Sequence, residues 1–335
     1  MWCWQGYVYQ GVSVRRFDQR QKITGNTMQE LISKLKDNIG SRFIGKDAVI
    51  HNMITALLAG GHILIEDVPG VGKTTLAKAL AGSIDSSFAR IQFTPDTLPT
   101  DVVGTSIYDA KETQFRVVKG PIHNQIVLAD EINRTSPRTQ SALLEAMEEG
   151  QVTIDGNTFV LPELFMVIAT QNPSENIGTY PLPEAELDRF MMKISLGYPD
   201  REMQIRLSKN YLNGVMEDAV QKILSAEDVV NMKKEVREVK ISDEVLEYAL
   251  EIVDGTRGLE ELKYGLSPRA ALDLLMASKA DAYIRGRDYV IPEDVIEMAG
   301  VTLPHRLVLT AKARMDRYTA EQLLTRVTDK ISRPR

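Results

Sequence analysis

A lysine and a threonine, Lys73 and Thr74, follow a glycine-bearing turn and open a helix-forming run that stops at Gly82. The apolar residues 63–65 before the turn predict a buried parallel strand. A strand, a turn with inward N–H groups and a helix N-terminus together bind phosphate; the lysine reaches the β- and γ-phosphates and the threonine hydroxyl ligates Mg²⁺. The predicted nucleotide-binding residues of this loop are Pro69, Gly70, Val71, Gly72, Lys73, Thr74 and Thr75.

One position departs from the generic phosphate-loop pattern G-x-x-x-x-G-K-[ST], because Asp67 occupies its first glycine position. An ordinary strand–turn–helix with a surface lysine is therefore the alternative interpretation of the loop.

Two carboxylates, Asp130 and Glu131, follow the apolar run 126–129. The end of a parallel strand places them beside the phosphate loop. Phosphoryl transfer needs one carboxylate to hold Mg²⁺, here Asp130, and one to orient and deprotonate the attacking water, here Glu131. Asn172 follows another apolar run, 164–169, at the same predicted edge. Its amide is expected to contact the γ-phosphate or the water, or alternatively to cap the turn at Pro173.

The elements that position these groups alternate between strands and helices. Two further strands are expected at 89–93 and 192–196, which gives an α/β domain with a parallel five-stranded sheet flanked by helices. Hairpins are expected at 106–118 and at 151–161, where Asp155-Gly156-Asn157 forms the turn. A helix at 136–150 begins with Ser136-Pro137.

Two helices, at 28–39 and 47–59, precede the loop and flank Ile44 and Gly45. Apolar residues just upstream of a phosphate loop suit an adenine pocket, and Ile44 is the candidate; core packing accounts for it equally well.

After residue 198 the pattern becomes purely helical, with helices expected at 225–234, 242–253, 268–284 and 292–299. We therefore expect an N-terminal appendage (1–26), a nucleotide-binding domain (27–198) and a helical lid domain (199–335). Arg269 lies in a first helical turn, where arginine is unfavourable, which indicates an anionic neighbour; a chance surface arginine is the alternative.

Composition narrows the class of protein. The net charge of −6 does not suggest a dedicated nucleic-acid binder, although residues 301–335 carry eight Lys/Arg against three Asp/Glu. That basic segment predicts a solvated helix face or, alternatively, a partner contact. A single cysteine, Cys3, excludes a disulfide framework and fits a reducing, cytoplasmic compartment. No apolar run approaches ~18 residues, and the four histidines lack metal-ligand spacing.

Taken in order, the motifs resemble those of the MoxR family of AAA+ ATPases, in the helix-2-insert clade. The resemblance spans residues 28 to about 304 and rests on segments 63–74, 127–134, 143–156, 169–173, 182–190 and 265–270. It implies an AAA+ domain with a C-terminal helical lid, and it implies ATP and Mg²⁺ as cofactors. Lys73 and Thr74 then belong to Walker A and Asp130 and Glu131 to Walker B. Asn172, Arg189 and Arg269 correspond to sensor 1, the arginine finger and sensor 2.

The resemblance also implies a homo-oligomeric ring, usually hexameric, in which Arg189 completes the neighbouring subunit's site. Such proteins are associated with maturation of client complexes, often with von Willebrand factor A domain proteins as partners. A chaperone-like remodeller is thus the expected function. A nucleic-acid translocase of the same clade and a nucleotide-gated scaffold are the alternatives. Nucleic acid is a disfavoured partner because the body of the chain is acidic.

Overall fold

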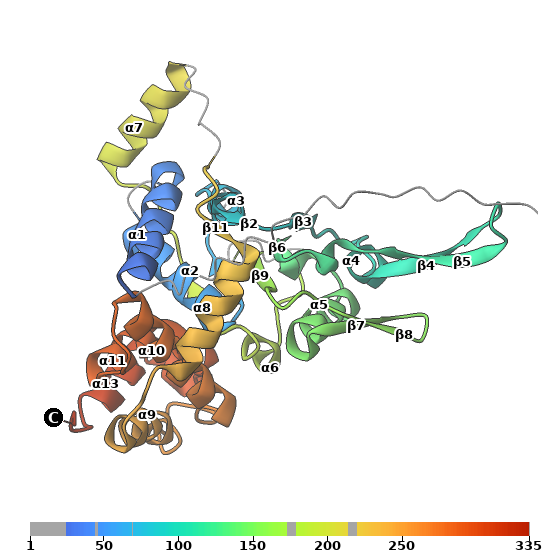
Figure 1. Cartoon of the computed structure of the whole chain (residues 1–335). Coiled ribbons are helices and arrows are strands. Elements are labelled where there is room, and N and C mark those ends of the chain that lie inside the picture. The colour runs from blue at the N-terminus through green and yellow to red at the C-terminus, as the bar shows by residue number, and fades with distance from the viewer. Residues whose placement is uncertain (1–24, 44–45, 69, 173–178, 214–219, 335) are drawn as a thin grey trace, which may run out of the picture.

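The computed structural model describes residues 25–43, 46–68, 70–172, 179–213 and 220–334 (Figure 1). Five parallel strands form its central sheet in the order β10-β1-β9-β6-β3. They are β1 (Ile63–Glu66), β3 (Phe88–Gln92), β6 (Ile126–Asp130), β9 (Met166–Gln171) and β10 (Met192–Ile194). The predicted five-stranded α/β fold is confirmed.

Alternate residues of the strands point to opposite faces of the sheet, as the two-residue period of a strand requires. Ile63 and Ile65 of β1 join an apolar cluster with α2 (Asp47–Ala59) and α3 (Lys73–Ser83). Leu64 joins the opposite cluster, which contains the apolar side of α5 (Pro137–Glu149). Both faces of the inner strands β1, β9 and β6 are covered, so these strands lack polar alternation, whereas the edge strands β3 and β10 carry Arg90, Gln92 and Lys193.

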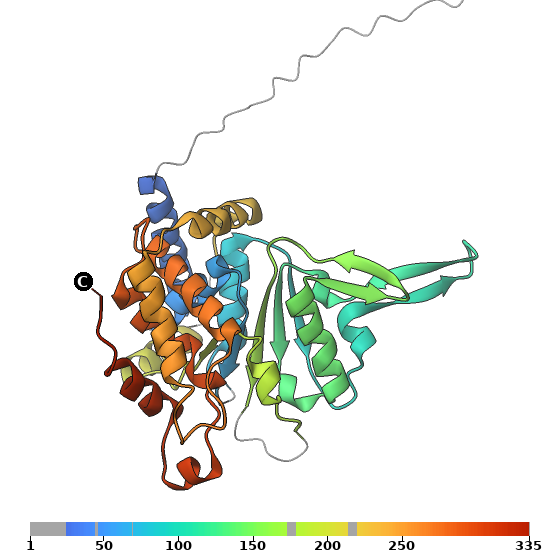
Figure 2. The same ribbon diagram turned by 90° about the horizontal axis from the view of Figure 1, so that it is seen from below.

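The C-terminal part of the chain is helical and packs onto the nucleotide-binding part. Its α8 and α10 contact α2, and α10 contacts α11, within one continuous apolar cluster. Figure 2 shows these helices gathered on one side of the sheet. The remaining helices are α1 (Gly25–Arg42), α4 (Pro99–Val103), α6 (Glu184–Leu187), α7 (Arg201–Leu212), α8 (Ala226–Glu238), α9 (Asp243–Gly255), α10 (Pro268–Ile284), α11 (Pro292–Thr302), α12 (Ala311–Met315) and α13 (Ala320–Thr328).

The helix starts follow their capping signals. Ser225, Ser242 and Ser267 each accept a hydrogen bond from the backbone N–H three residues on. Short elements escaped prediction, above all the parallel pair β2 (Ile84–Asp85) and β11 (Leu224–Ser225). The 3₁₀ turns are Pro121–His123, Ile132–Arg134 and Pro304–Arg306.

Two hairpins project from the end of the molecule opposite the C-terminal helices in both views (Figures 1 and 2). One pairs β4 (Gly104–Asp109) with β5 (Gln114–Lys119), and the other pairs β7 (Gln151–Ile154) with β8 (Asn157–Val160). Both were predicted. The second turn has two residues rather than three, because Asp155 and Gly156 both adopt positive φ and Asn157 already pairs. Among the described residues, no helix has the length and apolar character needed to cross a membrane.

Candidate active site

The loop between β1 and α3 has the backbone of an anion site. Gly70 and Gly72 have φ of 82° and 94°, and Gly72 caps the N-terminus of α3. A side chain at Gly72 would place its Cβ 3.0 Å from the Phe43 ring, so both φ and space require glycine there. The first N–H groups of α3 have no intrahelical acceptor and point out of its N-terminus. The loop therefore presents several donors and a positive dipole end to one point.

Lys73 lies across the ends of two adjacent strands. Its Nζ donates to the backbone oxygens of Asp67, at 2.6 Å, and Gln171, at 3.3 Å. Thr74 and Thr75 follow in the first turn of α3, both half-buried. The ammonium and the Thr74 hydroxyl are thus carried to the carboxyl edge of the sheet, as predicted from the order strand, loop, helix.

Asp67 has a structural reason to replace the usual glycine. Its Oδ2 accepts hydrogen bonds from Ser195 Oγ at 2.9 Å and from the N–H groups of Leu196 and Gly197, both at 2.6 Å. Its Oδ1 accepts from Val68 N at 2.8 Å. Burial alone would raise the pKa of this carboxyl, but the four donors outweigh it and hold the pKa below its ordinary value. The side chain ties the loop to the chain segment that leaves the sheet for the helical lid.

Asp130 ends β6 beside the loop and is held from two sides. Thr170 Oγ1 donates to its Oδ1 at 2.6 Å, and Arg90 donates to its Oδ2 through Nη2 at 2.6 Å and Nε at 3.2 Å. Arg90 lies on β3, the neighbour of β6. Arg90 thus neutralises one oxygen of the carboxylate that is the predicted magnesium ligand.

Glu131 adopts a left-handed backbone conformation, with φ 59° and ψ 48°. For a residue with a side chain this conformation is strained and is typical of functional sites. Thr170 Oγ1 accepts from the Glu131 N–H at 2.9 Å, while the carboxylate accepts from Gln92 at 3.0 Å and Arg134 at 3.1 Å. The half-exposed carboxylate therefore stands at the sheet edge beside Asp130.

Asn172 follows β9 at this same edge and is buried. Its backbone oxygen accepts from Asn133 Nδ2 at 3.4 Å. The structure thus brings together Lys73, Thr74, Asp130, Glu131 and Asn172, the five residues predicted to meet where parallel strands end.

A cavity of about 200 Å³ opens beside the loop. Phe43, Val71, Pro199 and Met203 give it an apolar side, and Arg42 and Lys46 line it as well. An apolar wall with a few polar groups is the lining that a nucleotide base uses, and the two cations suit the phosphates attached to it. The predicted adenine-contact residues Ile44 and Gly45, like Pro69 of the loop, lie outside the described residues.

Two predicted site residues lie elsewhere. Arg189 precedes β10, and the nearby N–H of Met191 donates to the oxygen of His62, which precedes β1. This is the amino edge of the sheet, whereas the phosphate loop follows β1 at the carboxyl edge, about 13 Å away for a four-residue strand. Arg189 Nη1 contacts Glu148 Oε2 at 3.1 Å, and Arg269 Nη1 contacts Glu148 Oε1 at 2.9 Å. Neither arginine lines the loop cavity of its own chain.

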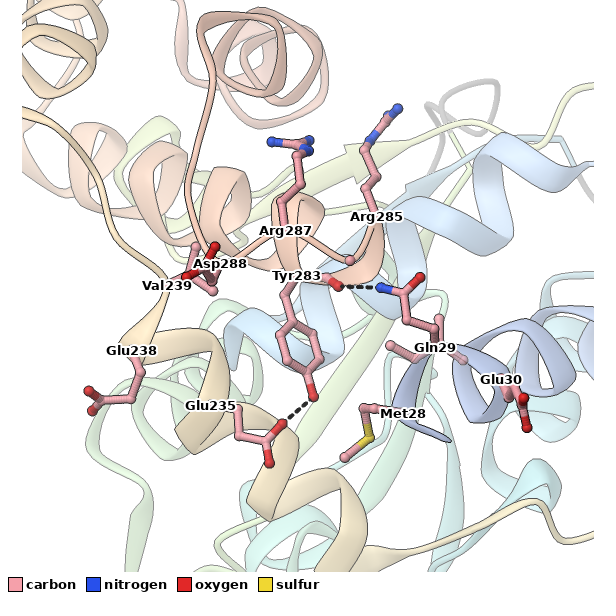
Figure 3. A pocket seen from close by; sticks show the side chains of 12 residues that line it. Met28, Gln29, Glu30, Glu235, Glu238, Val239, Tyr283, Arg285, Arg287 and Asp288 are labelled. Carbon is pink, nitrogen blue, oxygen red and sulfur yellow. Dashed lines mark hydrogen bonds between the residues drawn. The ribbon is translucent and has the colours of Figure 1, made fainter. Parts of the chain in front are cut away.

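A larger cavity, of about 800 Å³, lies away from the phosphate loop between α1, α8 and the end of α10. Figure 3 shows Tyr283 pointing toward Glu235, to which its hydroxyl donates at 2.5 Å, and Gln29 reaching the backbone oxygen of Tyr283. Acidic and basic side chains are mixed along its wall. These contacts fasten α1 to the lid helices, and the cavity lacks the glycine loop of a phosphate site.

The basic C-terminal segment is partly engaged inside the molecule. Arg306 is buried and pairs with Asp188 and Asp273, and Arg326 pairs with Glu261 at 2.8 Å. Two of its eight cations therefore support the fold rather than a solvated face, which weakens the nucleic-acid interpretation.

Four contact residues escaped sequence reasoning: Thr170, Arg90, Gln92 and Glu148. Thr170 lies two residues before Asn172 at the end of a predicted strand, so its position in the sequence could have identified it as a site residue. The other three come from β3 and α5, and only the order of strands and the crossing of α5 bring them to their partners.

This combination of a parallel sheet, a glycine loop closed by a lysine and two carboxylates at one edge defines a P-loop nucleotide hydrolase with a helical lid. Residues 62–192 match the model of the ATPase family associated with various cellular activities (AAA), and residues 255–327 match the AAA lid domain. The chain belongs to the AAA ATPase family and is of the MoxR type. ATP binding and ATPase activity follow from that membership.

Relatives extend over nearly the whole chain. YeaC of Bacillus subtilis is 46% identical over 307 residues, covering 92% of this chain and 96% of YeaC. Chaperone MoxR1 of Mycobacterium tuberculosis is 41% identical over 318 residues, covering 92% and 83%. A crystal structure from Cytophaga hutchinsonii, described as a candidate ATPase, superposes with a TM-score of 0.87 at 41% identity, covering 93% of this chain and 97% of that one.

Proposed function

We propose that the chain hydrolyses ATP with Mg²⁺ in a hexameric homo-oligomeric ring and acts as a chaperone-like remodeller of client protein complexes. The position of Arg189 and Arg269 carries this proposal. Both lie at the amino edge of the sheet, whereas the phosphate loop lies at the carboxyl edge of the same chain. A second copy that brings its amino edge to this loop would add Arg189 and Arg269 to it. AAA proteins are usually oligomeric, which agrees with this arrangement.

In the proposed reaction each residue at the carboxyl edge has one role. Lys73 neutralises the β- and γ-phosphates, and Thr74 and Asp130 would hold Mg²⁺, which supplies charge neutralisation of the phosphates. Oxygen groups and few protein ligands suit nucleotide-bound Mg²⁺, and the described residues contain no cluster of three or more His, Cys, Asp or Glu that could cage a metal. The residues at this edge therefore suit an Mg²⁺ ion that arrives bound to the nucleotide.

Glu131 takes a proton from water as the water oxygen bonds to the γ-phosphorus and ADP leaves. Asn172 orients that water or the γ-phosphate. Arg189 of a neighbouring copy stabilises the charge on the transferred group, and Arg269 assists it.

The client side of the proposal rests on two observations. One relative in hand, MoxR1, is named a chaperone. The β4–β5 hairpin carries exposed apolar side chains, with Phe115 at 74% and Tyr108 at 54% exposure. Exposed apolar side chains of this kind mark sites of interaction with other proteins. A von Willebrand factor A domain protein is the proposed partner, and the cytoplasm the proposed location.

Concentration dependence tests the ring. An arginine supplied in trans is worth about 10³–10⁵ in rate, so an isolated subunit should turn ATP over feebly. We expect turnover per subunit to rise with protein concentration, in parallel with mass by light scattering, and Glu131→Gln to bind ATP and remain assembled without hydrolysis. Constant turnover per subunit across the assembly range, or an ATP-bound monomer, would contradict the proposal.

A further inference from the structure

We propose that Glu148 is a positioning residue that holds the core arginine and the lid arginine together, so that both reach the neighbouring nucleotide as one unit. This inference rests on the proposed function, and the experiment below distinguishes a failure of the inference from a failure of the proposed function.

The geometry around Glu148 is that of a shared counter-ion. Each carboxylate oxygen accepts one contact, Oε2 from Arg189 at 3.1 Å and Oε1 from Arg269 at 2.9 Å. The two guanidinium groups come from different parts of the chain, one from the segment before β10 and one from the first turn of α10. Like charges repel, and a carboxylate between them offsets that repulsion. Glu145, Glu149 and Glu186 also line the surface pocket that contains Arg189, and Glu148 is the carboxylate that contacts both guanidinium groups.

Both arginines retain donors for an anion. A guanidinium has five N–H donors in a planar fork, and each arginine gives one terminal nitrogen to Glu148. The side chains are 30% and 36% exposed. Exposed, fixed and cationic groups suit a phosphate that arrives from outside this chain.

The backbone beside Arg189 is fastened by the lid. Arg306 Nη2 donates to the backbone oxygens of Asp188, at 3.2 Å, and Phe190, at 2.9 Å. His305 Nε2 also contacts Phe190 O at 2.8 Å, and Ser267 Oγ donates to the Asp188 carboxylate at 3.0 Å. The residues on either side of Arg189 are therefore fixed by lid residues. Because the Arg189 side chain in turn shares Glu148 with Arg269, the lid and the core present one combined cation.

The position of Glu148 is itself fixed by the core. It is the second-last residue of α5, and the oxygen of its neighbour Met147 contacts His62 Nε2 at 3.2 Å. His62 Nδ1 accepts from Val167 N at 3.0 Å, so the imidazole bridges α5 and β9. The carboxylate thus stands on a rigid support, which is what a positioning residue needs.

Two exposed apolar side chains lie near Arg269 in the sequence. Leu272 lies three residues after Arg269 on α10 and is 64% exposed, and Tyr264 is 56% exposed. Arginine and aromatic side chains are both enriched in protein–protein interfaces. A second copy of this chain is the partner that fits, because its phosphate loop lacks the arginines that this surface carries.

A mixed-subunit experiment tests the role of Glu148. Donor subunits carry Glu131→Gln, so they cannot hydrolyse ATP but keep their arginines; acceptor subunits carry Arg189→Ala, so they keep a working phosphate loop. Mixing should restore turnover. Donors with both Glu131→Gln and Glu148→Gln should restore about 10- to 100-fold less, the loss that misplacement of a positioned group by about 1 Å causes. The KM for ATP should stay unchanged, since the acceptor's loop is intact.

Glu251→Gln is the control, because Glu251 is an exposed carboxylate on α9, outside the pocket that contains Arg189 and without an ion pair in the described part of the chain. Donors with this change should restore full turnover.

The outcomes separate the two proposals. If Glu131→Gln donors fail to activate Arg189→Ala acceptors, the trans arrangement itself is wrong. If they activate and the Glu148→Gln donors activate equally well, with the same assembly by light scattering, the trans arrangement stands and the role of Glu148 is refuted.

Discussion

Asp67→Asn is a stringent test of how the phosphate loop is held. The wild-type carboxylate accepts four hydrogen bonds and is only 7% exposed. An asparagine of the same shape has one acceptor oxygen, which must face the three donors that converge on Oδ2. Its NH₂ group then faces the N–H of Val68, and that bond is lost.

The magnitude follows from the kind of bond. Hydrogen bonds to a charged group contribute about 1.5–3 kcal/mol and neutral ones about 0.5–1.5 kcal/mol. The three bonds that become neutral therefore lose about 3–4.5 kcal/mol together, and the bond that disappears adds about 1.5–3 kcal/mol, so the unfolding free energy falls by about 4.5–7.5 kcal/mol. Urea unfolding at pH 7.5 measures this loss. Asp96→Asn, an exposed carboxylate nearby in the chain, should stay within about 0.5 kcal/mol of wild type.

The stabilisation by the Asp67 carboxylate should depend on pH in one direction. The folded pKa of Asp67 lies below the ordinary 3.8, so its stabilisation is complete above about pH 3.8 and is lost as the pH falls through the folded pKa. The gap between wild type and Asp67→Asn should therefore be constant from pH 7.5 to pH 5 and close only in stronger acid. A loss below about 1 kcal/mol at pH 7.5 would refute the account, because the four donors would then be satisfied without the charge.

Two further predictions concern buried histidines and the magnesium site. Burial lowers the pKa of His62 to about 4 and of His305 to about 3, from 6.5, so the folded chain binds fewer protons and loses stability below pH 6.5. Between pH 7.5 and pH 5.5 each buried histidine lowers the unfolding free energy by about 1.4 kcal/mol. His305→Gln keeps a donor for Phe190 O and should roughly halve the combined decrease, as measured by urea unfolding at the two pH values. An undiminished decrease would contradict this. Arg90→Ala should lower the Mg²⁺ concentration for half-maximal ATPase activity about two- to fivefold, because the half-exposed ion pair between Arg90 and Asp130 is worth about 0.5–1 kcal/mol. An unchanged or higher Mg²⁺ requirement would show that Arg90 does not compete for Asp130.

The sequence was most informative where local rules decide the structure. The apolar runs before Lys73, Asp130 and Asn172 predicted three strands, and strands that run parallel must deliver their ends to one edge. The helical pattern after residue 198 predicted α8, α9, α10 and α11 within a few residues of their observed bounds. Such features depend on neighbours in the chain, so a single sequence contains them.

Contacts between distant segments could not be predicted in this way. The four donors around Asp67 come from residues more than 120 positions away, apart from Val68. The meeting of Arg189 and Arg269 at Glu148 depends on how α10 crosses the end of α5. No periodicity or turn signal encodes such a crossing, because it results from packing of the whole apolar cluster.

The β4–β5 hairpin is constrained at its base and open at its tip. A Cβ on Gly104 would lie 2.3 Å from the backbone oxygen of Val118, so the base tolerates no side chain there. Phe115, toward the tip, is 74% exposed and contributes little to the core. Substitutions near the tip therefore carry almost no folding penalty, and they leave the nucleotide site untouched. In the proposed role, the residues of this surface can change during evolution and bind new clients, while the nucleotide site stays unchanged.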